Sequence, residues 1–78
     1  MLHVNKVEHT ENHKLFIELS NGESGYFDLS PYLDKGIFTE LRDIKYLQQV
    51  KPDAFGICWP NGQDLSADTI EYELDKIV

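Results

Sequence analysis

A stretch of alternating apolar and polar residues that runs into an Asn-Gly pair constrains this chain more than any other feature. The alternation covers residues 14–20. Its apolar members that share one face are Leu15, Ile17 and Leu19. A period of two is typical of a strand with one buried face. Asn21 and Gly22 both tolerate the positive φ of a type I′ turn, which joins antiparallel strands through two residues. We therefore expect residues 23–28 to return antiparallel to residues 14–20.

A two-residue loop also determines which side chains lie opposite one another. It places Tyr26 opposite Ile17 on the core face, and Phe27 opposite Phe16 on the other face. If helices cover only one side of the sheet, the pair formed by Phe16 and Phe27 is exposed, and an exposed aromatic pair indicates a contact surface. The alternative is that another part of the chain covers the pair. Phe16 and Phe27 are therefore candidate residues for binding a partner or a second copy of the chain.

Shorter signals define the remaining elements. The further strands that we expect cover residues 2–9, 50–52 and 55–59, the last with Phe55, Ile57 and Trp59 on one face. The helix starts that we expect are Ser30 with Pro31 behind it, Asp43 before residues 44–48, and Ser66 before a final helix. That final helix has an apolar stripe at Ala67, Ile70, Leu74 and Ile77, with Lys76 in its last turn. The sequence thus predicts one α+β domain over residues 1–78: a small antiparallel sheet of N-terminal hairpin strands plus a later strand, with short helices and a C-terminal helix.

The charge balance excludes some classes of function. Seven Lys and Arg residues stand against fourteen Asp and Glu, a formal charge of −7. Nucleic-acid binding draws its affinity largely from cations that face phosphates, so we expect no direct nucleic-acid binding. A polybasic membrane anchor is disfavoured for the same reason, and no stretch reaches the ~20 apolar residues of a membrane span. We expect instead a basic protein partner, because an acidic surface steers a cationic one towards it.

Cysteine usage and the first residues point to a compartment. Cys58 is the one cysteine, so no disulfide can form within the chain. Residues 1–6 show no long apolar run after a charged start, unlike a secretion signal. We therefore expect a cytoplasmic protein.

The segment that starts at Trp59 and ends at Asp64 is the second candidate region. Trp59, followed by Pro60, Asn61 and Gly62, is a turn that carries a large aromatic side chain. Buried, Trp59 anchors a thin core; exposed, it would be an interface hot spot. Asp64 and Asp28 each precede a Leu-Ser pair that opens a helix. Their carboxylates fit a structural role as acceptors of backbone N–H groups, and the functional alternative is a ligand or metal pair.

Three other patterns in the sequence bear on possible chemistry. His9 and His13 are four residues apart, but they fall in a strand connection where that spacing aligns nothing, so we expect no metal site. Cys58 lies in an expected strand without a helix N-terminus or a histidine base beside it, so we expect no nucleophile. The glycines are too scattered for a phosphate-binding loop. We therefore expect no enzyme activity and no cofactor.

The sequence resembles the DUF-2442 family of small bacterial domains. The likeness is carried by the hairpin, by Asp28-Leu29-Ser30-Pro31 and by the segment Trp59-Pro60-Asn61-Gly62 with Asp64. The resemblance covers nearly the whole chain, and the last of these segments is the most specific. It implies a compact α+β fold. In some members a helix-turn-helix domain follows, and we expect none within residues 1–78. The resemblance also implies the antitoxin-like partner in a suspected toxin–antitoxin pair. Ala67 stands where relatives often have proline. No catalytic residue is carried over.

Taken together, the sequence predicts a non-enzymatic protein-binding domain, with Trp59, Asn61, Asp64, Phe16 and Phe27 as its candidate binding residues. The alternative is a small-molecule or metal-binding module that uses Asp64, Trp59 and the histidines. A third possibility is a homodimer through Phe16 and Phe27.

Overall fold

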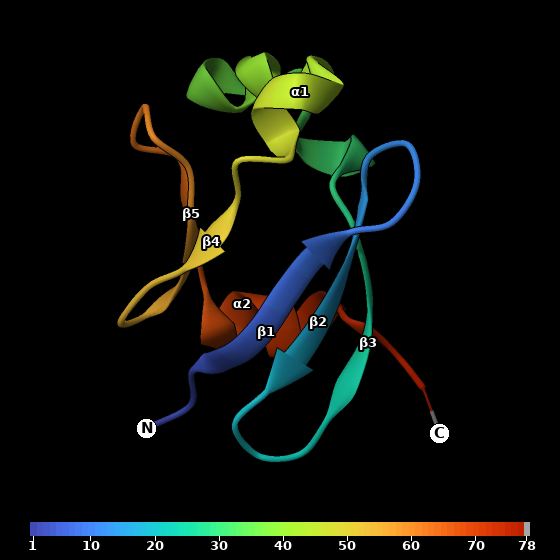
Figure 1. The fold of residues 1–78 in the computed structure, drawn as a ribbon, viewed down its shortest axis with the longest axis vertical. Helices are drawn as coiled ribbons and strands as arrows, with labels where there is room; N and C mark the ends of the chain where they lie inside the picture. Colours follow the sequence, from blue (N-terminus) through green and yellow to red (C-terminus); the bar gives the residue numbers. More distant parts are fainter. Residues whose placement is uncertain (78) are drawn as a thin grey trace.

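Two small antiparallel sheets share one hydrophobic core in the computed structural model, which describes residues 1–77 (Figure 1). The first sheet has the strand order β1-β2-β3-β7, formed by Val4–His9, Lys14–Leu19, Ser24–Asp28 and Asp75–Lys76. The second has the order β4-β5-β6, formed by Lys51–Pro52, Gly56–Cys58 and Asp64–Ser66. The α+β fold expected from the sequence is confirmed, with the later strands distributed over both sheets.

Short helical segments complete the fold. Two 3₁₀ segments, η1 (Ser30–Tyr32) and η2 (Gly36–Arg42), lead into α1 (Ile44–Leu47), and α2 (Ala67–Glu73) follows β6. Figure 1 shows η2 and α1 together at one end of the molecule, and α2 behind β1 and β2. The fully buried side chains include Leu15, Ile17, Phe27, Leu41, Leu47, Ile57 and Ile70. Because α2 covers one face of the four-stranded sheet, the opposite face is the one turned towards the viewer in Figure 1.

The register of the hairpin differs from the sequence expectation by one residue. Phe27 lies opposite Leu15 and Tyr26 lies opposite Phe16, so Phe27 is in the core and Tyr26 is on the outer face. The predicted pairing of Phe16 with Phe27 is therefore wrong. The cause is the loop: the Gly22 N–H donates to the Leu19 carbonyl oxygen at 3.0 Å, and the Leu19 N–H donates to the Glu23 carbonyl oxygen at 2.8 Å.

Those two hydrogen bonds enclose three loop residues, 20–22, instead of two. Gly22 has φ 91°, whereas Asn21 keeps a negative φ. A three-residue loop of this kind is a type I turn followed by a left-handed glycine, which forms a bulge. One extra residue in the loop moves every side chain of the returning strand to the other face.

The final helix is shorter than its apolar stripe predicted. α2 ends at Glu73, and Leu74 is buried but extended. Lys76 lies in β7, opposite Gly25 of β3, and Ile77 is about half exposed. A Cβ atom at Gly25 would clash with the backbone of Asp75, so the glycine is what lets β7 approach β3. Pairing with the edge of β3 therefore replaces the last helical turn.

Helical segments begin at all three predicted places, and the predicted side-chain caps form at two of them. The side chain of Asp43 accepts the Lys45 N–H at 3.0 Å, and that of Ser66 accepts the Thr69 N–H at 3.2 Å. At η1 the predicted role of Ser30 is wrong, because its own N–H donates to Asp28. Phe55, expected on the core face of β5, is 69% exposed, since the strand begins only at Gly56.

Candidate functional site

One row of side chains crosses the outer face of the four-stranded sheet. Glu8 lies opposite Phe16, Phe16 opposite Tyr26, and Tyr26 opposite Asp75. Residues that are directly opposite in antiparallel strands point to the same side, with Cβ atoms about 5 Å apart. The row therefore places two aromatic rings between two carboxylates, and we call these four residues the outer row.

The two rings of the outer row pack against each other. Their centroids are 5.7 Å apart and their planes meet at 65°, an edge-to-face arrangement. Phe16 is half-buried and Tyr26 is 43% exposed. Aromatic pairs of this geometry hold each other in place, so the partly exposed Tyr26 ring is braced by its neighbour.

Further charged residues flank the outer row on the same face. The neighbouring rows bring Lys6 opposite Glu18, and Lys14 opposite Asp28. The Lys6 Nζ also lies 3.9 Å from the Glu8 Oε1. An exposed ion pair of this kind contributes little to stability. The backbone N–H of Ser30 lowers the pKa of Asp28, and the charge of Lys14 adds to this effect. Carboxylates thus outnumber the lysines around the two rings.

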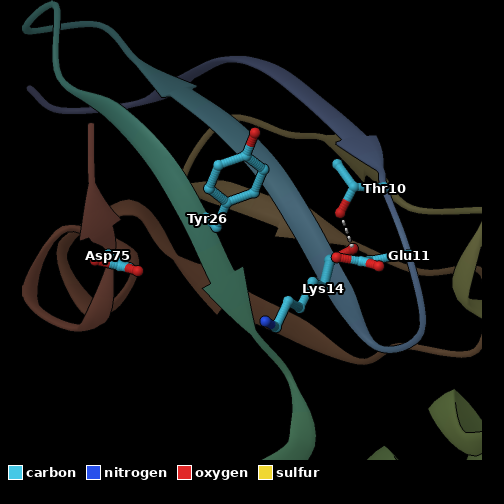
Figure 2. A pocket seen from close by; sticks show the side chains of 5 residues that line it. All are labelled: Thr10, Glu11, Lys14, Tyr26 and Asp75. Carbon is cyan, nitrogen blue, oxygen red and sulfur yellow. Dashed lines mark hydrogen bonds between the residues drawn. The ribbon is translucent and has the colours of Figure 1, made fainter.

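A hollow of about 440 Å³ opens beside Tyr26 (Figure 2). It is lined by Thr10, Glu11, Lys14, Tyr26 and Asp75. Figure 2 shows Asp75 on one side of the Tyr26 ring and the residues of the β1–β2 connection on the other. The volume lies in the range of about 300–1,000 Å³ that is usual for ligand pockets, but the lining is polar and charged except for the one ring. This chemistry favours a charged side chain over an apolar ligand.

The position of Asp75 depends on contacts made by β7. The Lys76 Nζ lies 2.9 Å from the Glu23 Oε2. The side-chain amide of Asn21 donates to Glu23 and to Glu71 of α2, both at 2.9 Å. The hydrogen bond with Lys76, followed by that with Asn21, lowers the pKa of Glu23 to about 2. The hairpin turn, α2 and β7 are thereby linked, and Asp75 is held beside Tyr26.

Two residues that the sequence proposed for binding belong to the core. Phe27 is fully buried and Trp59 is 2% exposed. The indole N–H of Trp59 donates to the Leu47 carbonyl oxygen at 2.9 Å, which ties β5 to α1. Neither side chain can meet a partner, so the hypothesis that they bind is corrected: Trp59 is the buried anchor that was the alternative.

Asn61 has a structural partner. Its side-chain amide donates to the Glu40 Oε2 at 2.8 Å, and its backbone N–H donates to the Tyr46 hydroxyl at 2.9 Å. Both bonds attach the turn after Trp59 to η2 and α1. The neighbouring Gln63, which sequence reasoning missed, is fully buried and joins the same polar cluster. A single glutamine has no local signal for burial, because its partners come from residues 17 to 26 positions away.

Asp64 is exposed in β6, opposite Cys58 of β5. Burial raises the pKa of the Cys58 thiol, and the charge of Asp53, with a smaller effect from Asp64, raises it further. A thiol in these surroundings is a weak nucleophile. Asp64 and Asp28 lie in different sheets. The Asp28 Oδ1 accepts the Ser30 N–H at 2.9 Å, which is the structural role expected for this carboxylate.

The histidines near the N-terminus make hydrogen bonds within the fold. The His9 Nε2 lies 2.8 Å from the Asn12 carbonyl oxygen, and the His13 Nε2 lies 3.3 Å from the Arg42 carbonyl oxygen. Among residues 1–77, no three His, Cys, Asp or Glu side chains gather in a way that could hold a metal ion. Trp59 is buried, so its ring is not accessible to a ligand of the small-molecule module expected from Asp64, Trp59 and the histidines.

No helix in the described part of the chain is long and apolar enough to cross a membrane. The fold is that of a small α+β domain with one uncovered sheet face. A family model described as "Protein of unknown function (DUF2442)" matches residues 4–75, and the chain belongs to this family. Searches of the curated proteins and of the solved structures gave no match.

Proposed function

We propose that this chain is a non-enzymatic protein-binding domain and that the outer face of its four-stranded sheet docks a basic protein. In this proposal it acts as the antitoxin-like member of a bacterial pair. The observation that carries the proposal is the outer row, in which the rings of Phe16 and Tyr26 lie between the carboxylates of Glu8 and Asp75.

Aromatic rings supply the apolar centre that a protein interface needs. Binding energy is concentrated in a few central side chains, among which tyrosine is enriched, and the surrounding polar residues exclude water. In this chain the Phe16 and Tyr26 rings are central on the face, and charged residues surround them. A partner that covers this face with an apolar side chain rimmed by Lys and Arg would match it in both respects.

The net charge of −7 favours a cationic partner. Long-range attraction accelerates association, and salt weakens it because ions screen exposed charges. If the partner is an RNA-directed toxin, the carboxylates would occupy the groove that otherwise holds phosphates. The single Cys58, unable to form a disulfide within the chain, fits a cytoplasmic site of action.

The test is binding to the protein encoded by the adjacent gene, followed by calorimetry at low and high salt. Phe16→Ser should weaken binding by about tenfold or more, since removal of a central aromatic side chain costs more than about 1.4 kcal/mol. Phe55→Ser is the matched control, because Phe55 is 69% exposed and lies in the β4–β5 turn. It should leave binding unchanged.

Three results would overturn the proposal: no binding, binding that salt does not affect, or equal losses in the two variants. Sizing chromatography of the chain alone can give a fourth result that would overturn the proposal. If the chain elutes as a dimer and Phe16→Glu converts it to a monomer, a second copy occupies this face instead of a basic partner.

A further inference from the structure

The hollow beside Tyr26 has the composition of a site for one cationic side chain. It combines an exposed aromatic ring with carboxylates on two sides, Asp75 across the strand pair and Glu11 in the β1–β2 connection (Figure 2). A cation over an aromatic ring is attracted by the negative ring face, and a carboxylate adds a charge-assisted hydrogen bond. The ring and the two acids can therefore act on the same group.

Arginine fits this lining better than lysine. Its guanidinium is planar, so it can stack on a tyrosine ring while its edge donates two hydrogen bonds to a carboxylate. It is also less strongly hydrated than an ammonium group, so its transfer from water into a half-open hollow costs less. Tyr26 presents the stacking surface, and Asp75 is its direct neighbour on the sheet.

The hollow also contains Lys14, whose positive charge opposes a second cation. Its side chain runs towards β3 (Figure 2), where its charge helps to lower the pKa of Asp28 after the larger effect of the Ser30 N–H. Lys14 lies opposite Asp28 in the register. A carboxylate outside the hollow thus offsets part of the Lys14 charge, and the repulsion that remains gives the site a measurable signature.

The walls of the hollow are held in place before any partner arrives. Tyr26 packs against Phe16, with ring centroids 5.7 Å apart. Asp75 is held by the pairing of β7 with β3. The Thr10 hydroxyl donates to the Lys14 carbonyl oxygen at 3.2 Å and closes the β1–β2 connection (Figure 2). A site that needs little ordering loses less affinity on binding.

We infer that this hollow receives an arginine side chain of the basic partner, with the guanidinium stacked on Tyr26 between Asp75 and Glu11. The inference rests on the proposed function, because it names the chemical group by which the partner would be recognised at the edge of the outer row.

The test is an NMR titration of the ¹⁵N-labelled chain with the blocked tripeptide acetyl-Gly-Arg-Gly-amide. The neutral control is the same peptide with citrulline, which keeps the shape of arginine without its charge. We expect saturable shifts at the amides of Glu11, Tyr26 and Asp75 with a dissociation constant on the order of 1–10 mM. The citrulline peptide should give none.

Variants locate the binding group. Tyr26→Leu removes the ring but keeps an apolar side chain, and Asp75→Asn removes a charge; each should weaken binding by about twofold to fivefold. Lys14→Gln should strengthen it by about twofold, because the opposing charge is lost. Asp34→Asn is the matched control, since it neutralises an exposed carboxylate between η1 and η2 and should change nothing. The dispersion of each amide spectrum verifies that the variant is folded.

The outcomes separate the inference from the proposed function. Equal shifts with arginine and citrulline peptides, or a lysine peptide that binds as tightly, would overturn the arginine assignment. So would a basic partner whose affinity Tyr26→Leu and Asp75→Asn leave intact; if Phe16→Ser still weakened that partner, the proposed function would stand. Arginine-selective binding in the hollow supports the assignment even if the adjacent gene product does not bind, a result that would refute the proposed function alone.

Discussion

The hydroxyl of Tyr46 donates a 2.6 Å hydrogen bond to the Oε1 of Gln63, whose side chain is fully buried. The Nε2 of Gln63 donates to the Ile37 carbonyl oxygen at 2.8 Å and to Glu40 at 2.9 Å. Gln63 lies in the turn that precedes β6, and its side-chain amide thereby connects this turn with η2 and α1. The end of the molecule where these short segments gather is held by this polar contact as well as by Leu41 and Leu47.

Gln63→Leu should destabilise the chain by about 1–3 kcal/mol, because it leaves the Tyr46 hydroxyl and the Ile37 carbonyl oxygen without their partner. Urea denaturation measures the change. Gln49→Leu, at an exposed position, is the control and should cost much less. If Tyr46→Phe and Gln63→Leu are combined, their effects should fall short of additivity, since they share one bond. Equal costs at positions 49 and 63 would contradict the structural role.

Tryptophan fluorescence reports Trp59 alone, because the chain has one tryptophan. The side chain is 2% exposed, so its emission should lie at short wavelength and acrylamide should quench it poorly until the chain is unfolded. Binding of a partner to the outer sheet face should leave the quenching unchanged. Efficient quenching in the native state would show that Trp59 is accessible, contrary to the fold.

The contact between Glu23 and Lys76 should make stability depend on pH in a defined window. Folding lowers the pKa of Glu23 from 4.5 to about 2, chiefly through the hydrogen bond with Lys76. The folded state therefore binds fewer protons, and the stabilisation is complete above pH 4.5 and is lost as the pH falls through about 2. The melting temperature of Glu23→Gln should lie below that of the parent at neutral pH and converge with it in acid. A pH-independent difference, or the same behaviour in Asp34→Asn, would refute this.

Gly22→Ala should destabilise the hairpin by about 1–2 kcal/mol, because φ is 91° at this position and a Cβ atom is strained there. Gly22→Asn should recover part of the loss, since asparagine tolerates positive φ better than other residues with a side chain. Thermal unfolding of the two variants measures the ranking. An alanine variant as stable as the parent would mean that the loop is not the three-residue form described above.

Much of the fold follows from local patterns. The buried face of β2 is the one that the alternation of Leu15, Ile17 and Leu19 predicts, and Asp43 and Ser66 cap the helices as expected. The register of the hairpin could not be obtained in the same way, because an Asn-Gly pair suits both a two-residue loop and a three-residue loop with a left-handed glycine. The difference decides whether Tyr26 or Phe27 faces outwards, and with it the composition of the candidate site.

The strand β7 escaped sequence reasoning for another reason. Leu74 and Ile77 continue the apolar spacing of α2, so a longer helix is the better local interpretation. Contacts distant in sequence override it: β3 offers its edge at Gly25, and Glu23 binds Lys76. Asp75 therefore enters the outer row through a non-local pairing that no window of sequence reveals.

The pairing of residues 75 and 76 with β3 has a bearing on biosynthesis. The three hairpin strands are translated before β7, and the edge of β3 that faces away from β2 has no neighbour along Gly25 and Tyr26 until about fifty further residues have been translated. In that interval the nascent chain displays an open strand to any other extended polypeptide. A partner made at the same time and place could meet the domain while it is still being assembled, before β7 closes this edge of the sheet.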